Sequence, residues 1–586
     1  MSFQQSNTDA KWRHKWGFAD TEFIIHEDSS IEMTGNRYLL CGYKMYDFIP
    51  FIERIINSKI SQDSMKQEIE DKQTPAPIIN ENFFEVLKEK FNAGQYTMDD
   101  EVRLEHSHGQ TSIDEIYQVF YDRISRAVDL VFYPYTDYDV EIIVQLACIH
   151  NICLIPYGGG TSVSNALTVP ESELRMVVSI DMAYMNKIVW IDKANLRACV
   201  QAGITGLNLE KELAQLGFTA GHEPDSIEFS TLGGWIATHA SGMKKNKYGN
   251  IEDIVETFTL QTPSGKMELA SPQPRVSMGM NPVKLLFGNE GNLGIIVNAI
   301  IKIHPKPRFK KYQSVVFPSL DSGIAFLREL YTRQLLPASI RLMDNTQFKM
   351  GQALNPKYSK FQSFIRKLQF KLLELKKFNK DNMVVATLVF EDDRDKVILH
   401  EKKLLKLAKQ FNGIKGGSTN GQRGYNLTFV VAYLRELAFK LHLLSETMET
   451  TVPWNKIQQV YASVVNCAYN KHHEFSLPGK PLICVRITQI YHTGVCMYFT
   501  YLISCRNVSQ PAKVFSKIEH ALRETILING GSISHHHGVG KLRKDFMFQV
   551  LSQDTIKMLQ KFKQSIDPQN IFGISNNIFS LDEINR

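Results

Sequence analysis

The sequence contains no Cys-x-x-Cys pair, and its eight cysteines are scattered singly along the chain. Closely spaced cysteine pairs build zinc sites and the frameworks of small disulfide-rich proteins. Neither class is therefore expected, and reduced thiols in an intracellular compartment are the simpler interpretation. No metal site is predicted from the cysteines.

Long apolar or basic runs are missing as well. No apolar run reaches the ~18 residues of a membrane-spanning helix, and residues 1–15 lack the apolar core of a signal peptide. The last three residues, Ile584 to Arg586, are not a Ser-Lys-Leu-type peroxisomal address. The net charge is only +6 without a Lys/Arg tract, so a nucleic-acid partner is not expected. We expect a soluble or peripheral protein whose slight basic excess suits an anionic small molecule or membrane surface.

The pattern of the chain changes near residues 78 and 307. Apolar runs at 129–133 and 152–155 flank a helical pattern at 139–150, which predicts strand, helix, strand and then a glycine-rich turn. Further strands are expected at 176–180, 188–191, 197–201, 257–262, 294–304, 387–390 and 486–504. Helices are expected at 210–216, 394–411, 434–451 and 512–527.

Two stretches outside this pattern carry hypotheses of their own. Residues 46–60 are amphipathic and precede a Pro-rich linker at 74–77. Residues 350–380 are rich in Lys, Phe and Leu, which fits either a partly amphipathic segment in contact with lipid or a surface helix pair.

Three loops of small polar residues each lie beside a predicted strand, at 156–162, 225–242 and 288–294. In the first, the run Gly158-Gly159-Gly160 allows positive φ and close approach to a ligand, and successive N–H groups form a concave site for phosphate oxygens. A plain tight turn would explain the glycines of one loop alone. Three such loops can converge on one extended anionic ligand such as a dinucleotide, although none has the Rossmann or P-loop pattern.

The motifs PxGGGTS, DSxEFSTxGGW and GxEGxLGI resemble the vanillyl-alcohol-oxidase type of FAD-binding family. The resemblance implies FAD, held without a covalent link because the first loop offers Tyr157 and no His or Cys. Asn289 and Asn292 replace the usual Ser and Thr of the third loop, which leaves binding intact but changes its hydrogen bonds. The cofactor-binding residues implied by position are Tyr157, Gly158, Gly159, Gly160, Thr161, Ser162, Val163, Asp225, Ser226, Ile227, Glu228, Phe229, Ser230, Thr231, Thr238, His239, Ala240, Ser241, Glu290, Gly291, Asn292, Leu293, Gly294, Ile295 and Ile296.

Three adjacent histidines, His535, His536 and His537, form the most unusual stretch of the chain. A histidine has an unperturbed pKa of ~6.5, which suits a general base or an anion binder. Adjacent side chains diverge on a regular backbone, so one metal ion would not easily bind all three. A metal site and a purely structural loop stay open as alternatives.

Other candidates lie on predicted elements nearer the C-terminus. Arg341 is expected at a strand edge and Arg435 on a helix, while Cys496, Tyr498 and Thr500 alternate onto one face of a strand. Taken singly, each Arg or Tyr is better explained by a surface ion pair or a core aromatic than by a functional role.

These residues, together with several longer motifs, resemble a narrower family, the alkyldihydroxyacetonephosphate synthases. Its resemblance covers most of the chain and is carried by the motifs at 16–18, 221–225, 240–246, 248–253, 339–344, 420–425, 534–543 and 567–572. It implies exchange of the acyl chain of acyl-dihydroxyacetone phosphate for a long-chain fatty alcohol, through a covalent flavin N5 intermediate without net redox change.

The resemblance also implies roles, an architecture and a location. Tyr498 matches a proton donor/acceptor, which at a reference pKa of ~10 needs a nearby cation to act as a base. Arg435 matches a substrate-binding arginine, Arg341 an arginine needed for activity, and one of His535 to His537 would deprotonate the alcohol. The expected fold is α+β: an N-terminal helical segment (1–78), a PCMH-type FAD-binding domain (79–306), a cap domain (307–560) and a C-terminal segment returning to the FAD domain (561–586). The family works at the lumenal face of the peroxisome, so peripheral membrane contact is expected, and a homodimer is left open.

Two other function classes compete with this interpretation. A D-2-hydroxy-acid dehydrogenase on the same scaffold would reduce its flavin when given a substrate such as D-lactate. A catalytically inactive lipid-binding protein fits poorly with a full set of His, Tyr and Arg candidates.

Overall fold

The computed structural model describes residues 10–61, 65–70, 72–269, 272–356 and 378–579. The chain forms two compact units, each built from two separate stretches. We call Met1–Gln67 with Pro307–Ser532 the cap unit, and Glu68–Lys306 with Ile533–Arg586 the glycine-loop unit. Each unit is described by itself.

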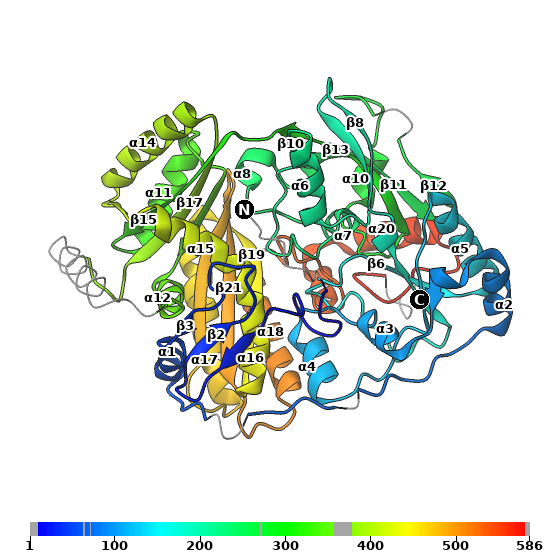
Figure 1. The fold of residues 1–586 in the computed structure, drawn as a ribbon, viewed down its shortest axis with the longest axis horizontal. Helices are drawn as coiled ribbons and strands as arrows, with labels where there is room; N and C mark the ends of the chain where they lie inside the picture. The colour runs from blue at the N-terminus through cyan, green and yellow to red at the C-terminus, as the bar shows by residue number, and fades with distance from the viewer. Residues whose placement is uncertain (1–9, 62–64, 71, 270–271, 357–377, 580–586) are drawn as a thin grey trace. The chain divides into compact units, whose positions relative to one another are not determined.

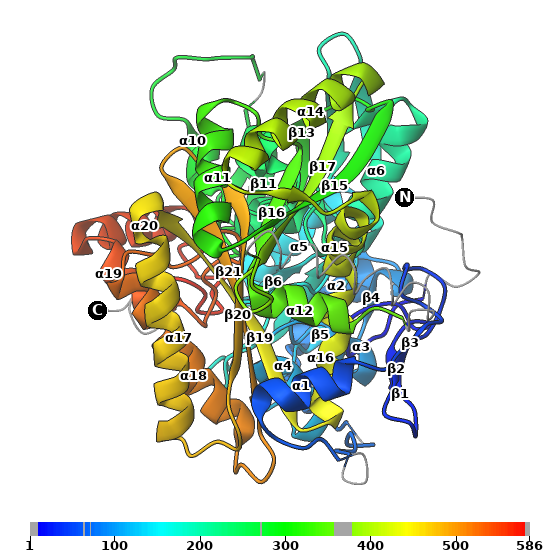
Figure 2. The same ribbon diagram turned by 90° about the vertical axis from the view of Figure 1, so that its left-hand side faces the viewer.

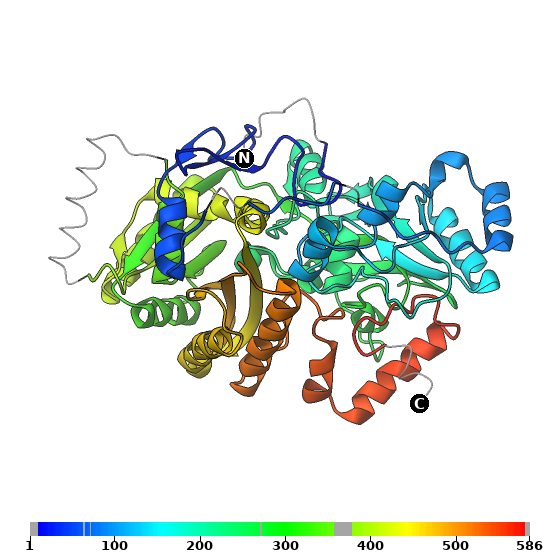
Figure 3. The same cartoon turned by 90° about the horizontal axis from the view of Figure 1, so that it is seen from below.

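The units differ from the expected domains at three places. The N-terminal stretch belongs to the cap unit, and the return to the glycine-loop unit occurs at residue 533 rather than 561. The predicted N-terminal helical segment has a three-stranded sheet, β1 (Phe23–Ile25), β2 (Ile31–Met33) and β3 (Lys44–Met45), before its helix α1 (Phe48–Ile56). Figure 3 shows this dark-blue stretch with the yellow elements of the same unit, where Trp16 N–H donates to Glu436 Oε1 at 3.0 Å.

The glycine-loop unit contains two main sheets. The first has the order β4 (Tyr96–Thr97), β5 (Leu130–Phe132), β7 (Val177–Asp181), β6 (Cys153–Tyr157), with β7 parallel to both β5 and β6. The second is antiparallel with the order β12 (Gly265–Met267), β11 (Val255–Thr262), β13 (Ile295–Lys302), β9 (Arg197–Gln201), β8 (Ile188–Asp192). Its helices are α2 (Glu81–Lys90), α3 (Asp100–Glu105), α4 (Ile113–Tyr121), α5 (Asp137–His150), α6 (Gly206–Gln215), α7 (Leu232–Thr238), α8 (Lys245–Tyr248), α9 (Ile251–Ile254), α10 (Pro282–Leu286), α19 (Met547–Val550) and α20 (Gln553–Ile566).

Local sequence explains why the first glycine loop follows a rigid strand. Thr136 and Asp139 form a capping box that starts α5, and Asn151 ends it in the left-handed region at φ 54°. The strand that follows, β6, is apolar and mostly buried up to Tyr157. The predicted strand, helix, strand and glycine turn are therefore confirmed.

The C-terminal stretch completes the core of the glycine-loop unit. Ile571 and Phe572 are fully buried in the cluster that includes Phe132 and Leu154, and Leu154 N–H donates to Ile571 O at 2.9 Å. The motif at 567–572 is structural, because Asp567 accepts from the N–H groups of Ile571 and Phe572. Figure 1 shows this red stretch among the blue to green elements of the same unit.

The cap unit is built on a seven-stranded antiparallel sheet. Its order is β18 (Ile414–Lys415), β15 (Phe309–Phe317), β17 (Val384–Asp392), β16 (Ser339–Met343), β20 (Leu482–Ile490), β21 (Gly494–Ser504), β19 (Leu443–Pro453). Its remaining helices are α11 (Leu320–Thr332), α12 (Asn345–Ala353), α14 (Arg394–Gln410), α15 (Ser418–Val430), α16 (Leu434–Lys440), α17 (Ile457–Glu474) and α18 (Pro511–Ile528). Figure 2 shows α17 and α18 running along the strands β19 to β21, and Tyr501 of β21 packs against Phe515 of α18.

Three predictions for the cap unit are wrong in part. The helix expected at 434–451 ends at Lys440, and β19 follows after His442, whose φ of 56° turns the chain. The single strand expected at 486–504 is the hairpin of β20 and β21. Arg341 lies on β16 in the middle of the sheet and not at an edge, because β17 and β20 pair with it from either side.

The hypothesis of lipid contact at 350–380 falls mostly on residues 357–377, which lie outside the described residues. Across the part of the chain that the structure describes, no helix is long and apolar enough to cross a membrane.

Candidate active site

The first two glycine loops are packed directly against each other. A Cβ atom on Gly158 would lie 2.4 Å from Thr231 Oγ1, and one on Gly159 would lie 1.9 Å from the carbonyl oxygen of Phe229. Both distances are shorter than any real contact, so only glycine permits this approach. Gly160 also needs its freedom, since it has a φ of 67°.

The third loop meets both of the others. Gly291 has a φ of 77° and lies against the ring of Pro156 in the first loop. A Cβ atom on Gly291 would be 3.2 Å from this ring. The N–H groups of Gly288 and Glu290 donate to Ile236 O and Ala237 O, which lie on α7 within the second loop segment. The predicted convergence of three loops within one unit is present.

Polar atoms without partners lie buried around this convergence. Among the described residues, neither ring nitrogen of His222 has a hydrogen-bond partner, nor has Asn292 Oδ1. Burial, and secondarily the neighbouring His536, lower the pKa of His222 to about 3, so its ring is neutral. Since buried polar groups normally find partners, these atoms fit a bound molecule with its own donors and acceptors, as the predicted dinucleotide has.

The two asparagines of the third loop hold its shape. Asn289 Nδ2 donates to Leu286 O, its Oδ1 accepts from Gly291 N–H, and Asn292 Nδ2 donates to Asn289 O. The substitution expected to change hydrogen bonding therefore serves mainly the loop itself. Tyr157, in contrast, is buried in a hydrophobic cluster with Ile155 and Val177, so only its backbone is left for a ligand.

The histidine stretch is tied to the first glycine loop. The N–H groups of Lys541 and Leu542 donate to Ser164 O, and the fully buried Arg543 donates to Val163 O at 3.2 Å and to Gly538 O at 3.0 Å. Burial lowers the pKa of Lys541 to about 7, and its amine donates to Asn165 O and Ala166 O.

Glu290 ties the same stretch to the third loop. Its Oε1 accepts from the N–H groups of Val539 and Gly540, each at 2.8 Å, and its Oε2 accepts from Asn577 Nδ2 at 3.2 Å. Its side chain therefore holds the histidine stretch, a role that the sequence alone did not indicate. The expectation that Glu290 contacts a cofactor stays a prediction for its backbone.

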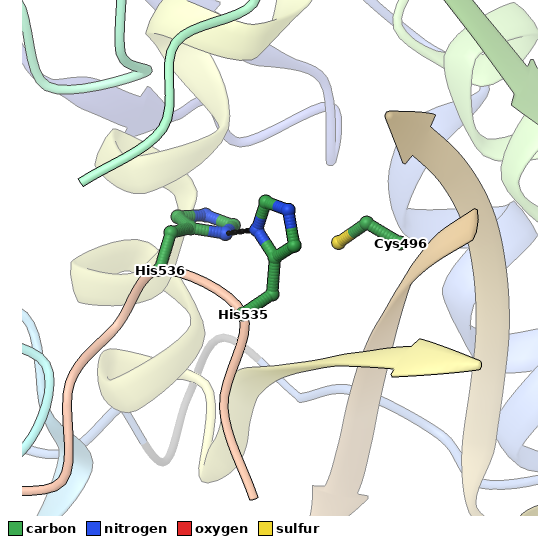
Figure 4. A group of neighbouring side chains, drawn as sticks. All are labelled: Cys496, His535 and His536. Carbon is green, nitrogen blue, oxygen red and sulfur yellow. Dashed lines mark hydrogen bonds between the residues drawn. The ribbon is translucent and has the colours of Figure 1, made fainter. Parts of the chain in front are cut away.

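The three histidines adopt different environments. His535 Nδ1 and His536 Nδ1 are 2.7 Å apart and share one hydrogen bond (Figure 4), so one of them is the donor and the other the acceptor. His537 is the most buried of the three, and its backbone N–H donates to Ser534 Oγ at 3.1 Å. Because the shared bond occupies both Nδ1 atoms, proton transfer by His535 or His536 would use an Nε2 atom.

In the cap unit, the strand register gathers the other candidates on one face of the sheet. Residues directly opposite in an antiparallel pair point to the same side. Tyr498 is opposite Arg486 on one side and Glu449 on the other. Arg486 is also opposite Met343, two residues from Arg341 on β16, so Arg341 shares the face.

The two predicted arginines are buried and held by neighbours. Arg341, 5% exposed, donates to Thr428 on α15. Arg435, 8% exposed, lies on α16 with its Nη2 atom 3.7 Å from Glu436 Oε1, which also accepts from Trp16 N–H. Tyr498 Oη is 3.2 Å from Thr447 Oγ1.

Sequence reasoning missed Arg486. Its guanidinium carbon lies 4.2 Å from the centre of the Tyr498 ring, and its side chain is 8% exposed. A charged residue in an otherwise apolar strand, beside a strand that carries a candidate tyrosine, was a usable indication.

Comparisons with known proteins match both units. A family model described as "FAD binding domain" matches residues 128–271, and one described as "FAD linked oxidases, C-terminal domain" matches residues 306–573. The first of these models covers the first two glycine loops, and the second covers the cap sheet and the three histidines. The third loop, residues 288–294, lies between the two matched ranges.

Relatives match over nearly the whole length. The alkyldihydroxyacetonephosphate synthase of Caenorhabditis elegans is 41% identical over 570 residues, covering 97% of this chain and 94% of that protein. The enzyme of the same name from Dictyostelium discoideum is 32% identical over 597 residues, covering 100% and 96%. A solved alkyldihydroxyacetonephosphate synthase structure superposes with a TM-score of 0.83 at 27% identity, covering 96% of this chain and 98% of that one.

Proposed function

Because the chain belongs to the family of alkyldihydroxyacetonephosphate synthases and is an FAD-dependent enzyme, we propose that it forms the ether bond of alkyl-dihydroxyacetone phosphate. In this reaction the acyl chain of acyl-dihydroxyacetone phosphate is exchanged for a long-chain fatty alcohol. The observation that carries the proposal is the combination of a histidine stretch hydrogen-bonded to the first and third loops with a buried Arg/Tyr face on the cap sheet.

The reaction balances without an oxidant or a reductant. The bond between the substrate C1 carbon and the acyloxy oxygen breaks, a bond from C1 to the alcohol oxygen forms, and a fatty acid leaves. The alcohol loses one proton, and the leaving carboxylate or solvent gains it. A proton on C1 is acidic because the carbon lies beside a ketone, which makes its removal and return a feasible step.

FAD would be held by the backbone of the three loops, with His222 and Asn292 as buried polar partners. When bound, the flavin supplies an N5 atom that serves as a nucleophile and an electron sink. We propose that it is held without a covalent link, because the first loop, residues 157–163, contains no His or Cys.

The cap residues have separate roles. Arg435, a planar guanidinium on α16, suits the substrate phosphate because it offers a fork of donors to an anion. Tyr498 moves the C1 proton. Arg341 fixes helix α15 against the same sheet, because its guanidinium donates to Thr428.

We assign deprotonation of the alcohol to the histidine stretch. The hydrogen bond between His535 and His536 leaves one Nε2 atom as an acceptor when both rings are neutral. Burial keeps His222 uncharged beside them, so the His222 ring does not oppose protonation of the base.

The deciding experiment is an exchange assay with labelled fatty alcohol and acyl-dihydroxyacetone phosphate, run beside a flavin-reduction test with D-lactate. The proposal expects labelled ether and no flavin reduction; flavin reduction without ether would instead identify a 2-hydroxy-acid dehydrogenase. Tyr498→Phe is expected to abolish ether formation while FAD stays bound. His536→Ala or His537→Ala should lower the rate by ~10²-fold or more if a general base is lost.

For the cell, we propose peripheral contact with the lumenal face of the peroxisomal membrane, because both proposed substrates carry long lipid chains. Binding of the purified protein to vesicles of peroxisomal lipid composition, and its fractionation with peroxisomes, test this proposal. A protein that stays with the soluble fraction in both experiments contradicts it.

A further inference from the structure

Tyr498 is flanked by two ionisable residues on neighbouring strands. Arg486 of β20 and Glu449 of β19 are each directly opposite it in the register of the sheet. Glu449 is 1% exposed, Arg486 8% and Tyr498 9%, so all three are withdrawn from solvent. The Arg486 guanidinium carbon lies 4.2 Å from the centre of the tyrosine ring.

Other polar groups of the cap unit share the face that carries Tyr498. Thr447 offers only a hydroxyl, 3.2 Å from the Tyr498 oxygen. Cys484 and Cys496 share the face by strand alternation, and burial raises the pKa of both thiols, which keeps them neutral. Arg341 on β16 is a second cation of this face. Arg486 is the cation stacked on the Tyr498 ring, and Glu449 opposes it with a carboxyl group.

A tyrosine that accepts a proton must first exist as a phenolate. A guanidinium stacked on the ring favours the anionic form, since an opposite charge within ~4–6 Å stabilises it. The attraction is strong here because both groups are shielded from water.

We propose that Arg486 is the positioning residue that makes Tyr498 competent as a proton acceptor. The inference rests on the proposed function. In the step it supports, the C1–H bond of the substrate breaks, the electron pair stays on C1, and the Tyr498 phenolate takes the proton to become a neutral phenol. Arg486 touches the tyrosine ring and acts on the substrate only through it.

The test compares three variants of the full-length FAD-loaded enzyme. Arg486→Met removes the charge at similar length, Arg486→Lys retains it, and Arg523→Met removes another buried arginine of the cap unit, one that pairs with Glu519 on α18. For each, the dependence of kcat/KM on pH is measured in the exchange assay.

For Arg486→Met we expect the acidic limb of the pH profile to move up by about one to three pH units. At neutral pH this lowers kcat by ~10-fold or more while the KM for the fatty alcohol changes little. Arg486→Lys should keep the acidic limb close to its wild-type position, because the positive charge is retained. Arg523→Met should leave the pH profile unchanged. A wild-type profile for Arg486→Met overturns the inference, as does failure of lysine to restore it. If Arg486→Met does not fold, Arg486→Gln takes its place.

A second measurement needs no substrate. The near-ultraviolet absorbance of tyrosinate is titrated for the wild type against Tyr498→Phe, and for Arg486→Met against the double variant, which isolates Tyr498 in each background. Tyr498 should ionise at higher pH without Arg486; equal titration in both backgrounds overturns the inference. Wild-type enzyme without exchange activity would instead overturn the proposed function, and the titration distinguishes the two failures.

Discussion

Replacing Glu290 tests whether its carboxylate holds the histidine stretch. In Glu290→Ala, the N–H groups of Val539 and Gly540 and the amide of Asn577 lose their acceptor. In Glu290→Gln, the Oε1 atom that accepts both backbone bonds is retained. The pair of variants thus separates the loss of the acceptor from the loss of the charge.

The magnitude follows from the buried donors. An unsatisfied buried donor costs about 1–3 kcal/mol, so orphaning two backbone N–H groups costs roughly 2–6 kcal/mol before relaxation. Removing the carboxylate offsets part of this free-energy cost, because the folded protein no longer has to bury a charge. The burial cost shows in the pKa of Glu290, which is raised despite the three hydrogen bonds that lower it. We expect a net local loss of about 2–4 kcal/mol for Glu290→Ala and a change within about 1 kcal/mol for Glu290→Gln.

Hydrogen exchange measures this directly. The amides of Val539 and Gly540 should lose roughly 30- to 700-fold of their protection in Glu290→Ala and little in Glu290→Gln, since 1.4 kcal/mol corresponds to tenfold. The rate of the enzymatic exchange of the acyl chain for the fatty alcohol should fall in Glu290→Ala, while the FAD content is retained. Unchanged protection of both amides in Glu290→Ala would show that the carboxylate does not hold this stretch. A loss of FAD with protection intact would return Glu290 to the cofactor-binding residues.

Three further predictions concern single positions. Gly159→Ala places a Cβ atom 1.9 Å from a backbone carbonyl of the second loop, so we expect loss of the visible flavin absorbance after gel filtration; Gly94→Ala, whose nearest atom would be 3.7 Å away, should keep it. Burial raises the pKa of the Asp344 carboxyl group from 3.8 to about 6. The protonated group therefore contributes about 3 kcal/mol to the free energy of unfolding below pH 3.8, and this contribution is lost as pH rises through about 6. Asp344→Asn should flatten the pH dependence of urea unfolding over this range, and an unchanged slope would contradict the assignment. Gly17→Ala, at φ 106° with a Cβ atom 2.1 Å from a buried tyrosine ring, should lower the free energy of unfolding by ~1–2 kcal/mol or more, whereas Gly42→Ala, at φ 76° in open space, carries only the backbone strain; equal thermal shifts in the two variants would show that the ring contact is unimportant.

The parts of the fold predicted from sequence are those set by neighbours along the chain. The cap at Thr136 and Asp139, the apolar run of β6 and the glycines after it are local patterns, and each lies where expected. Arg435 was placed on a helix for the same reason. Local propensity and patterning were sufficient there.

The errors involve pairing between distant residues. The predicted helix at 434–451 includes residues 443–451, but pairing with β21 makes this part a strand whose Thr447, Thr450 and Thr451 suit a sheet. Arg341 is predicted at a strand edge, but β17 and β20 pair with β16 from either side. Both partner strands lie far along the chain, so no local pattern indicates the pairing. The contact of Glu290 with residue 540 spans 250 positions, and no local pattern encodes it.

The order of the chain constrains how the protein is made. The core around Phe132 and Leu154 stays open until Ile571 and Phe572 leave the ribosome, since these two side chains fill it. Until then, early strands expose apolar surface, and a premature stop before Asp567 would remove these two side chains as well as Asp567, which positions their backbone. Nascent chains of this protein should therefore depend on chaperones late in synthesis, and nonsense mutations shortly before codon 567 should be as damaging as early ones.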